Sequence, residues 1–332
     1  MASKRPPHRR HPTTLIVFLI FYWLVVVPVF PWAQLGHESI ANLAQTLVSN
    51  DVLAKVRVIL NTNDLASVAL WADQARQLMK DEFHPSPLKG DAEAEQFIKD
   101  HPDNDKWHFA DLPLGTFQYV YQGRFAVTND IVPSLDHCVA VLEGKSKTLT
   151  RAQALRYVIH LVGDIHQPLH VGCGFYVSNS VGGATLLKDP DEIDNPQAHD
   201  AGANLLLFVT GHTTNKLHAY WDDALVRKVD TSPGNVHMLE ILRNSIDARR
   251  WKSAGNYHDW PALWAKDSVT EANGAYDGIT FGAARFTKKG KPEEIDITLA
   301  ATYEARQTPR VTRQLAKAAF HLAELLNRIH WQ

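Results

Sequence analysis

Two pairs of polar residues, each made of a histidine and an aspartate, have the spacing that metal chemistry requires. His160 and Asp164 lie four residues apart, and so do His218 and Asp222. On a helix this spacing puts both side chains on one face, within reach of one ion. Imidazole and carboxylate groups are zinc ligands, and Zn²⁺ takes four ligands at about 2.0–2.2 Å. Each pair therefore supplies half of a zinc site, and two pairs indicate more than one metal ion.

A surface hydrogen bond is the common alternative for such a pair. The segment around His160 argues against it, because His160 and Asp164 interrupt a helix that is otherwise filled with apolar residues between 155 and 162. A carboxylate buried there without a partner would carry a large desolvation cost. His170, two residues after Pro168, adds another histidine to this stretch. These features favour metal ligation, although spacing alone leaves the number of ions open.

The elements that must position these side chains are mostly helices. Apolar residues recur at three- and four-residue spacing in the segments 37–60, 150–166, 235–246 and 309–329. Strand-like alternation is scarce and is clearest in 203–210, while 172–202 is rich in Gly, Asp, Pro and Asn. We therefore predict a single all-α domain over residues 32–332, with a long loop or short hairpin near 172–210.

The N-terminal segment differs from the rest of the chain. Residues 1–12 contain Lys4, Arg5, Arg9 and Arg10 without an acid, and residues 13–30 are almost entirely apolar. A basic head before an apolar run is typical of an export signal. A retained membrane anchor is the alternative, because the run approaches the length that spans a bilayer, about 17–25 residues. We predict a signal peptide over residues 1–31 and an exported protein, periplasmic or secreted.

Composition excludes several classes of protein. The chain has 332 residues, of which 45% are hydrophobic and 21% charged, so it is not a disordered, collagen-like or disulfide-framework protein. The net charge is −2, and losing residues 1–31 would make it more negative, so a broad basic surface is not the means of binding nucleic acid. Cys138 and Cys173 fit one disulfide in an exported protein, but the sequence leaves their pairing open.

Together these motifs resemble one family, the secreted zinc-dependent single-strand-specific nucleases, which also act as 3′-nucleotidases and share a superfamily with the bacterial zinc phospholipases C. The matching segments stand in family order and are Trp32-Ala-Gln-Leu-Gly-His37, Trp71-Ala-Asp73-Gln-Ala-Arg76, Trp107-His108-Phe109-Ala-Asp111, His160-Leu-Val-Gly-Asp164-Ile-His-Gln-Pro-Leu-His170, Gly202-Ala-Asn204 and Thr214-Asn-Lys-Leu-His218-Ala-Tyr-Trp221-Asp222. The run from His160 to His170 is highly specific. The resemblance covers nearly all of the chain after residue 31.

The resemblance implies a cluster of three zinc ions. The first ion would be bound by Asp73, His108, His160 and Asp164, and the second by His170, His218 and Asp222. The third would be bound by His37, a second oxygen of Asp164, and the amino group and carbonyl oxygen of Trp32. The amino group of Trp32 becomes a ligand only if the chain is cut after Pro31, which is why we favour a cleaved signal peptide over an anchor.

Three features depart from the family pattern. Pro31 is a poor residue before a signal-peptide cut, and a cut after Ala33 would remove Trp32. Ala203 stands where the family usually has a second glycine before Asn204, and the 172–202 loop is long. Because this loop borders the expected cleft, it could change which substrates enter.

The implied reaction is hydrolysis of a phosphodiester. Water bound by two Zn²⁺ ions ionises near neutral pH, so the cluster, with Asp73 and Asp164 among its ligands, supplies hydroxide without a separate protein base. Arg76, one turn after Asp73, is expected to bind the phosphoryl oxygens, where negative charge grows. A surface ion pair is the alternative role for Arg76. The products would carry 5′-phosphate and 3′-hydroxyl ends.

Unpaired bases are the expected partners of the cleft. Phe109, directly after His108, could stack on a base while Asp111 accepts hydrogen bonds from base N–H groups, and Asn204 is also expected to bind substrate. Stacking contributes about 1–3 kcal/mol per base and requires a base that is free of its duplex partner. The alternative role for Phe109 is a core aromatic residue beside a metal ligand.

We therefore predict an exported zinc nuclease and 3′-nucleotidase acting on single-stranded DNA and RNA. A phospholipase C with the same three-zinc cluster is the second hypothesis, but proteins of that kind usually have Glu at the position of Asp222 and often an added lipid-binding domain. A metal-binding protein without catalysis is the third, and Arg76 argues against it. Nothing in the sequence predicts a stable protein partner, so we expect a monomer that meets a membrane only through its signal segment.

Overall fold

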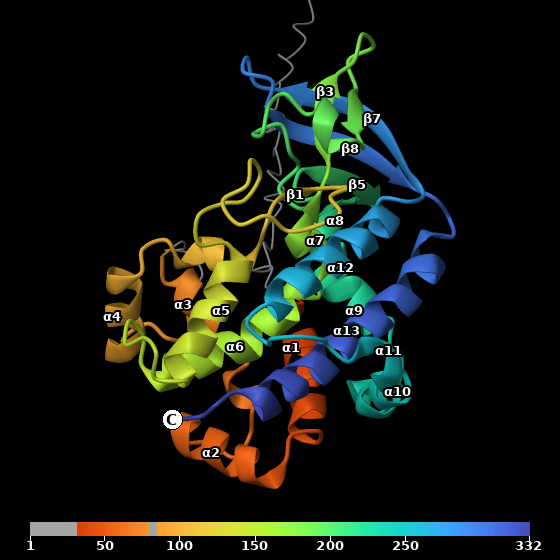
Figure 1. The fold of residues 1–332 in the computed structure, drawn as a ribbon. Coiled ribbons are helices and arrows are strands. Elements are labelled where there is room, and N and C mark those ends of the chain that lie inside the picture. The colour runs from red at the N-terminus through yellow and green to blue at the C-terminus, as the bar shows by residue number, and fades with distance from the viewer. Residues whose placement is uncertain (1–31, 80–84) are drawn as a thin grey trace, which may run out of the picture.

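Helices form the body of this computed structural model, and a small group of strands extends from one end of that body (Figure 1). The structure describes residues 32–79 and 85–332, so the predicted signal peptide at 1–31 lies outside the described residues. The predicted all-α class is confirmed in its main feature, because most of the regular structure is helical.

The helices range from single turns to one of 26 residues. The α-helices are α1 (Ala33–Gln45), α2 (Asn50–Leu60), α3 (Trp71–Gln77), α4 (Ala92–Asp100), α5 (Ile131–Leu142), α6 (Arg151–Ile165), α7 (Pro168–Val171), α8 (Leu217–Ala219), α9 (Leu225–Arg227), α10 (Met238–Asn244), α11 (Ala248–Trp251), α12 (Trp260–Ala275) and α13 (Tyr303–Arg328). Short 3₁₀-helices are η1 (Ala66–Val68), η2 (Asn104–His108), η3 (Pro190–Glu192) and η5 (Pro233–Asn235), and η4 (Tyr220–Ala224) is a turn of π-helix.

The strands form one four-stranded sheet and two smaller pairs. They are β1 (Leu112–Pro113), β2 (Gly172–Cys173), β3 (Phe175–Ser178), β4 (Ala184–Leu187), β5 (Leu206–Thr210), β6 (Thr213–Lys216), β7 (Ile279–Phe286) and β8 (Pro292–Leu299). The large sheet has the order β6-β5-β8-β7, in which β5 and β8 are parallel and the other neighbours antiparallel. β3 and β4 form the hairpin expected near 172–210, and β5 lies within the predicted strand 203–210.

Helix α6 is the central element of the body. Thr150 caps its first turn in a capping box with Gln153, and Pro168 begins the next helix, so both ends of α6 are determined locally. Nearly every residue after Gln153 is buried, and α6 packs against α1, α5 and α13. Because this helix is buried on all sides, a charged residue on it must find its partner inside the protein.

Several predicted elements differ from the observed ones at their ends. The segment 37–60 forms two helices, α1 and α2, and α10 is shorter than the predicted 235–246. Helix α13 begins at Tyr303 and includes Pro309, although proline is more typical of the first helical position. Strands β7 and β8 were not predicted. In β8 the buried Ile295 and Ile297 alternate with more exposed residues. Two apolar side chains are too short a pattern to predict a strand.

Cys138 and Cys173 do not form a disulfide. Both are buried free thiols, with Cys138 on α5 and Cys173 on β2. Burial raises the pKa of each thiol above its ordinary value. The pairing that the sequence left open is therefore not made in this structure.

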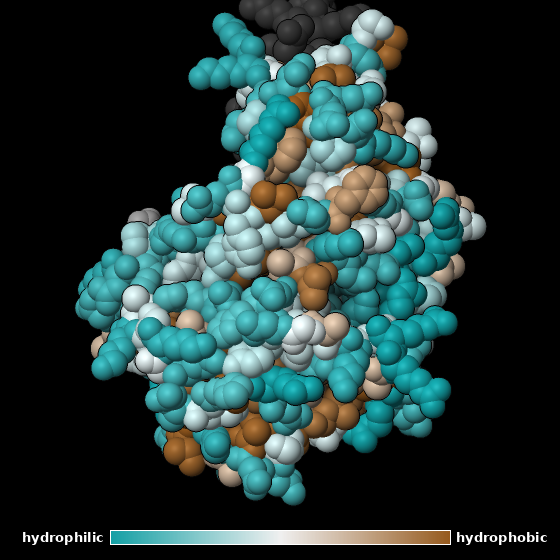
Figure 2. All heavy atoms as spheres, in the orientation of Figure 1, coloured by the Kyte–Doolittle hydropathy of each residue, from teal (hydrophilic) through white to brown (hydrophobic). Residues whose placement is uncertain are grey.

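The surface drawn in Figure 2 is mostly hydrophilic, and its apolar side chains lie in small, separate patches. This distribution is usual for a folded domain whose core contains most of its large apolar side chains. Among residues 32–79 and 85–332, no helix is both long enough and apolar enough to cross a membrane.

Candidate metal centre

The first group of polar side chains is centred on Asp164. Its Oδ2 atom lies 3.0 Å from Nδ1 of His108 and 3.1 Å from Nε2 of His160. These two nitrogens are 3.1 Å apart, and Oδ1 of Asp73 lies 3.6 and 3.7 Å from them. All four side chains are fully buried. Elements α3, η2 and α6 therefore bring four donors from three parts of the chain to one point.

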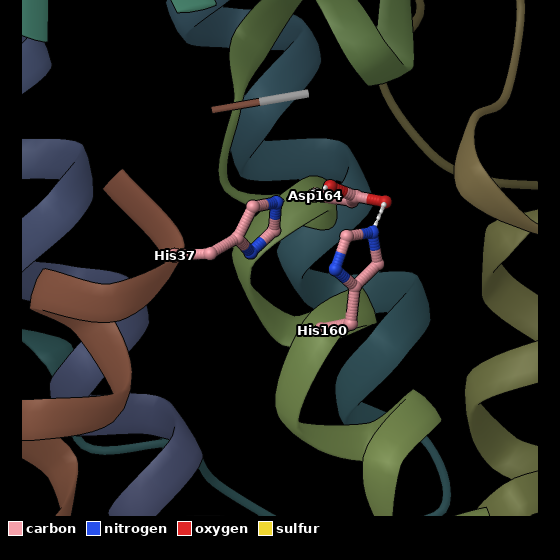
Figure 3. A group of neighbouring side chains, drawn as sticks. All are labelled: His37, His160 and Asp164. Carbon is pink, nitrogen blue, oxygen red and sulfur yellow. Dashed lines mark ion pairs between the residues drawn. The ribbon is translucent and has the colours of Figure 1, made fainter. Parts of the chain in front are cut away.

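His37 approaches the other oxygen of Asp164 from helix α1. Its Nε2 lies 3.2 Å from Oδ1 of Asp164, and its ring stacks on that of His160 with centroids 4.1 Å apart. Figure 3 shows the carboxylate of Asp164 next to both imidazoles, with His37 on a separate helix. A Cβ atom at Gly163 would lie 2.8 Å from Nδ1 of His37. The close contact between α1 and α6 therefore requires glycine at this position.

His170, His218 and Asp222 form a second group of donors. Nε2 of His218 lies 3.2 Å from Oδ2 of Asp222, and Nε2 of His170 lies 3.9 Å from Oδ1. Asp222 is in η4, and π-helical turns of this kind are frequent at functional sites. The backbone N–H of Trp32 and the side-chain amide of Gln167 donate to Oδ1 of Asp222, at 3.2 and 2.7 Å. These donors orient the carboxylate so that Oδ2 faces His218.

Backbone carbonyls orient three of the imidazoles through their Nδ1 atoms. The acceptors are the carbonyl oxygens of Ala69 (for His160, 2.8 Å), His108 (for His170, 2.8 Å) and Gly202 (for His218, 2.6 Å). Each bond holds a proton on Nδ1 and turns Nε2 toward the aspartates, where the neutral form of the ring can bind a metal ion. A hydrogen bond at the distal ring nitrogen is the usual way in which a metal-binding imidazole is oriented.

The turn at residues 200–204 has a tight backbone. Gly202 has φ +62°, and a Cβ atom there would lie 2.1 Å from the carbonyl oxygen of Leu169. Glycine is therefore required, and it allows the Gly202 carbonyl to reach His218. Ala203 has φ 65°, a conformation that costs an L-residue about 1 kcal/mol. The position at which the resemblance implies a second glycine is thus one where glycine would relieve strain.

Burial and neighbouring charges control the protonation of these groups. Burial lowers the pKa of His108 well below its ordinary value and that of His170 to about 3, so both imidazoles are neutral near pH 7. Burial also opposes protonation of His160, but the carboxylates of Asp164 and Asp73 outweigh it and raise the pKa of His160 to about 9. Burial alone would raise the pKa of Asp164, yet His160 and His170 lower it well below its usual range. Burial raises the pKa of Asp73 and Asp222 instead, so the lowered pKa of Asp164 marks this carboxylate as the one that most favours a cation beside it.

Several of the inward donor atoms make no hydrogen bond among the described residues, and apart from the ion pair of Asp73 with Arg76 their close contacts are with one another. They are Nε2 of His37, Oδ1 and Oδ2 of Asp73, Oδ1 of Asp164, Nε2 of His170 and Oδ2 of Asp222. A buried polar atom without a partner costs about 1–3 kcal/mol. So many in one place need a common partner that accepts both nitrogen and oxygen lone pairs, and a metal ion is such a partner.

The donor sets have the size of metal sites. Three groups, each with ligand atoms within 4.8 Å of one another, are His37, His160 and Asp164; Asp73, His108 and His160; and His170, His218 and Asp222. Nitrogen and oxygen ligands of tetrahedral Zn²⁺ lie about 3.3–3.6 Å apart, which is near the distances measured around Asp164. The residues therefore fit a cluster of divalent metal ions.

The other predicted site residues lie on the same elements or next to them. Arg76 on α3 pairs with Oδ1 of Asp73 at 2.9 Å, and 18% of its side-chain surface is exposed. Phe109 and Asp111 follow η2 and are half-buried, so both are accessible from solvent. The amide of Asn204 donates to a backbone carbonyl in its own turn at 3.0 Å. Arg76 thus forms an ion pair, which is the alternative role considered for it, and its partner Asp73 is a predicted zinc ligand.

The sequence matches the S1/P1 Nuclease family over residues 32–330. The chain belongs to this family. It is 26% identical to Endonuclease 2 of Arabidopsis thaliana, over 95% of this chain and 97% of that protein. It is 26% identical to Nuclease S1 of Aspergillus oryzae, over 90% of this chain and 92% of that protein, and 23% identical to Nuclease P1 of Penicillium citrinum, over 90% and 98%. The predicted class, a nuclease and therefore a hydrolase, is confirmed.

In this S1/P1 nuclease the predicted histidine and aspartate ligands all lie in the three groups, and Trp32 lies beside Asp222. Their assignment to particular ions stays a prediction. Sequence reasoning missed Gln167, which is buried and orients Asp222, although it stands inside the specific run from His160 to His170. It also missed the orienting carbonyls, which leave no sequence signal because every residue has one.

Proposed function

We propose that this S1/P1 nuclease is an exported, zinc-dependent phosphodiesterase. It cleaves single-stranded DNA and RNA to products with 5′-phosphate and 3′-hydroxyl ends, and it removes the phosphate of 3′-nucleotides. The observation that carries the proposal is the convergence of buried histidines and aspartates, several of whose inward atoms make no hydrogen bond among the described residues. Membership of a nuclease family supports nucleic acid as the substrate.

Three Zn²⁺ ions are the proposed cofactors. The first would be held by Asp73, His108, His160 and Asp164, the second by His170, His218 and Asp222, and the third by Trp32, His37 and Asp164. When bound, the ions supply a nucleophile from water and positive charge beside the phosphate. The protein keeps His108 and His170 neutral by burying them, which preserves their lone pairs for ligation.

Arg76 is proposed to bind the phosphoryl oxygens of the substrate. Its contact with Asp73 at 2.9 Å holds the guanidinium at the edge of the buried cluster. A guanidinium has five N–H donors, so it can serve this carboxylate and a phosphate together. Because phosphoryl oxygens gain negative charge as the P–O bond breaks, a bidentate cation at this place stabilises the transition state more than the ground state.

Phe109 is proposed to stack on an unpaired base while Asp111 accepts a hydrogen bond from a base N–H group and Asn204 contacts the substrate. The half-buried state of Phe109 and Asp111 supports this, because a core aromatic residue would be fully buried. Stacking requires an exposed base face, so a duplex must open before it binds. Preference for single strands then follows from the cost of opening.

The proposed export signal ends at Pro31. In the structure the backbone nitrogen of Trp32 lies 3.2 Å from Oδ1 of Asp222, so a new amino terminus at Trp32 would begin beside the ligands. N-terminal sequencing of protein recovered outside the cytoplasm tests this. A mature chain that starts at Trp32 supports the assignment, and one that starts at Gln34 would remove Trp32 as a ligand.

A substrate panel tests the proposed activity. Purified protein is assayed on single-stranded DNA, RNA, 3′-AMP, duplex DNA and phosphatidylcholine, with the Asp164→Asn variant prepared in parallel to exclude contaminating nucleases. We expect turnover of the first three substrates, loss on chelation, recovery with Zn²⁺, and cleavage of duplex slower by about 5- to 150-fold from lost stacking. Turnover of the lipid without nucleotide turnover would contradict the proposal and favour a phospholipase C.

A further inference from the structure

A fourth group of metal-binding residue types lies outside the three groups described above. Asp111, Cys173 and His199 place one ligand atom each within 4.8 Å of one another. Nδ1 of His199 lies 3.7 Å from Oδ1 of Asp111. None of the three matches a zinc ligand implied by the family resemblance, and Cys173 is the one cysteine in any of the groups found among the described residues.

Backbone hydrogen bonds hold the three segments together. Cys173 on β2 pairs in parallel with Pro113 on β1, so Asp111, two residues before Pro113, lies on the same face of the ladder as Cys173. His199 faces Phe175 across an antiparallel bridge, and Phe175 is two residues after Cys173. All three side chains are thus directed to one face by pairing of extended segments, so they form a prebuilt arrangement.

The exposure of the three side chains suits an ion that enters from solvent. The Cys173 thiol is fully buried, whereas the side chains of Asp111 and His199 are 16% and 15% exposed. Among the described residues, the carboxylate of Asp111 has His199 at 3.7 Å as its partner and no hydrogen bond within normal distance. A largely buried carboxylate in this state gains from a cation held at short range.

The chemistry of the donors selects the kind of ion. Thiolate and imidazole are ligands for zinc and related transition metals, whereas magnesium and calcium prefer oxygen ligands. Burial raises the pKa of the Cys173 thiol well above its ordinary value, so without metal this group is protonated. On binding, the S–H bond is lost to a metal–sulfur bond and the proton passes to solvent. The thiolate and the carboxylate together then neutralise a divalent ion.

We propose that Asp111, Cys173 and His199 bind one further transition-metal ion of the zinc class, separate from the three-zinc cluster. Three protein ligands leave the fourth tetrahedral position open to solvent or to a substrate group. Cys173 and His199 both belong to the segment 172–202, so this segment supplies two of the three ligands.

The site has a consequence for substrate binding that rests on the proposed function. Asp111 is the residue proposed to accept a hydrogen bond from a base, and an ion on its carboxylate removes that acceptor. Binding of the fourth ion therefore weakens binding of nucleic acid, and zinc in excess of the cluster inhibits the enzyme. Zinc bound to the histidine and aspartate cluster would remain in place.

Cobalt substitution tests the site through a signal that the cluster cannot produce. The complete mature protein, from Trp32 onward, is freed of metal and titrated with Co²⁺. The near-ultraviolet charge-transfer band of a cobalt–thiolate bond is recorded. Histidine and aspartate ligands do not give this band. We expect it in the wild type and in Cys138→Ser, which removes the other buried cysteine, and its complete loss in Cys173→Ser. Absence of the band in the folded wild type would overturn the proposal.

A second variant guards against a folding defect in Cys173→Ser. His199→Gln changes a partly exposed loop residue, and loss of this ligand should weaken cobalt binding at the thiolate on the order of 100-fold. If the band of His199→Gln appears with the same affinity for Co²⁺ as in the wild type, the thiolate binds metal without His199, which also overturns the proposal.

Zinc inhibition separates this inference from the proposed function. In the wild type, hydrolysis of single-stranded DNA should fall as free zinc rises above the level that fills the cluster, and Cys173→Ser should resist that fall. A thiolate band in a protein that hydrolyses no nucleic acid would contradict the proposed function alone. Full nuclease activity in a protein without the band would contradict the fourth site alone.

Discussion

Asp164→Asn is the sharpest test of the metal cluster, because the two oxygens of this one carboxylate serve different groups. Oδ1 lies 3.2 Å from Nε2 of His37, while Oδ2 lies 3.0 and 3.1 Å from the nitrogens of His108 and His160. The substitution keeps the shape of the side chain and removes its charge. It should therefore disrupt the first and third of the proposed zinc sites and spare the second, that of His170, His218 and Asp222, which has no Asp164 ligand.

The expected size of the effect follows from linkage. An ion at a free concentration about 100 times its dissociation constant adds about 2.7 kcal/mol to the free energy of unfolding. In a domain of this size 1 kcal/mol shifts the melting temperature by about 2 °C, so each ion contributes about 5 °C. The wild type should lose about 15 °C on chelation, and Asp164→Asn should lose only about 5 °C.

Thermal unfolding with zinc and with chelator, together with metal analysis, measures this difference. Asp130→Asn is the matched control, since Asp130 is also fully buried but accepts hydrogen bonds from Tyr119 and Val132 and belongs to none of the metal groups. The Asp130→Asn substitution should change the melting temperature by the same amount with and without metal. Its fall in melting temperature on chelation should therefore equal that of the wild type. If Asp164→Asn keeps the full shift of the wild type, the shared-carboxylate reasoning is refuted.

Four further predictions follow from the same geometry. Arg76→Met should lower kcat/KM on single-stranded DNA by about 10²- to 10³-fold, the effect of removing one preorganised donor to a transition-state oxygen, with metal content unchanged by elemental analysis. Phe109→Ala should weaken binding of single-stranded DNA by about 1–3 kcal/mol while hydrolysis of a non-nucleotide phosphodiester stays near wild type; equal losses would show that the ring acts through folding. Gln167→Leu removes the 2.7 Å hydrogen bond to Asp222 and should lower zinc affinity at one site by about 10- to 100-fold in a competition titration, leaving the other sites intact. Burial lowers the pKa of His170 to about 3, so at pH values between about 3 and 6.5 the unfolded chain binds more protons than the folded one. The contribution of His170 to the free energy of unfolding is therefore complete above about pH 6.5 and is lost on acidification. Other buried groups act in the opposite direction, since the pKa of His160 is raised to about 9, so urea unfolding of the metal-free wild type is compared with that of metal-free His170→Gln. Between pH 7 and pH 5 the midpoint should fall further, or rise less, in the wild type than in the variant, and the same change in both would contradict the neutral, buried state of this imidazole.

Local pattern was enough for some of the fold and part of the site. The apolar periodicity of 150–166 predicted α6, and its observed bounds are set by the Thr150 cap and the chain turn before Pro168. The four-residue spacing of His160 and Asp164 placed both on one helical face, and their 3.1 Å contact follows from helix geometry. The resemblance then identified the family correctly.

Other features depended on contacts between distant segments. β7 and β8 were missed, because β8 is stabilised mainly by pairing with its neighbours and only Ile295 and Ile297 give it a strand pattern. The disulfide question was also beyond the sequence, since Cys138 and Cys173 lie on separate elements whose packing determines whether their sulfur atoms meet. The group of Asp111, Cys173 and His199 exists only because extended segments pair in one register.

The sequence by itself therefore determined which residues could bind metal and which helical faces would present them, because helix geometry is a local property of the chain. Tertiary structure alone decided that His37, Asp73 and His108 reach the same carboxylate, and that Nε2 of His160, His170 and His218 is turned inward. Those choices rest on the packing of α1 against Gly163 and on particular backbone carbonyls, and neither is encoded in the spacing of residues along one segment.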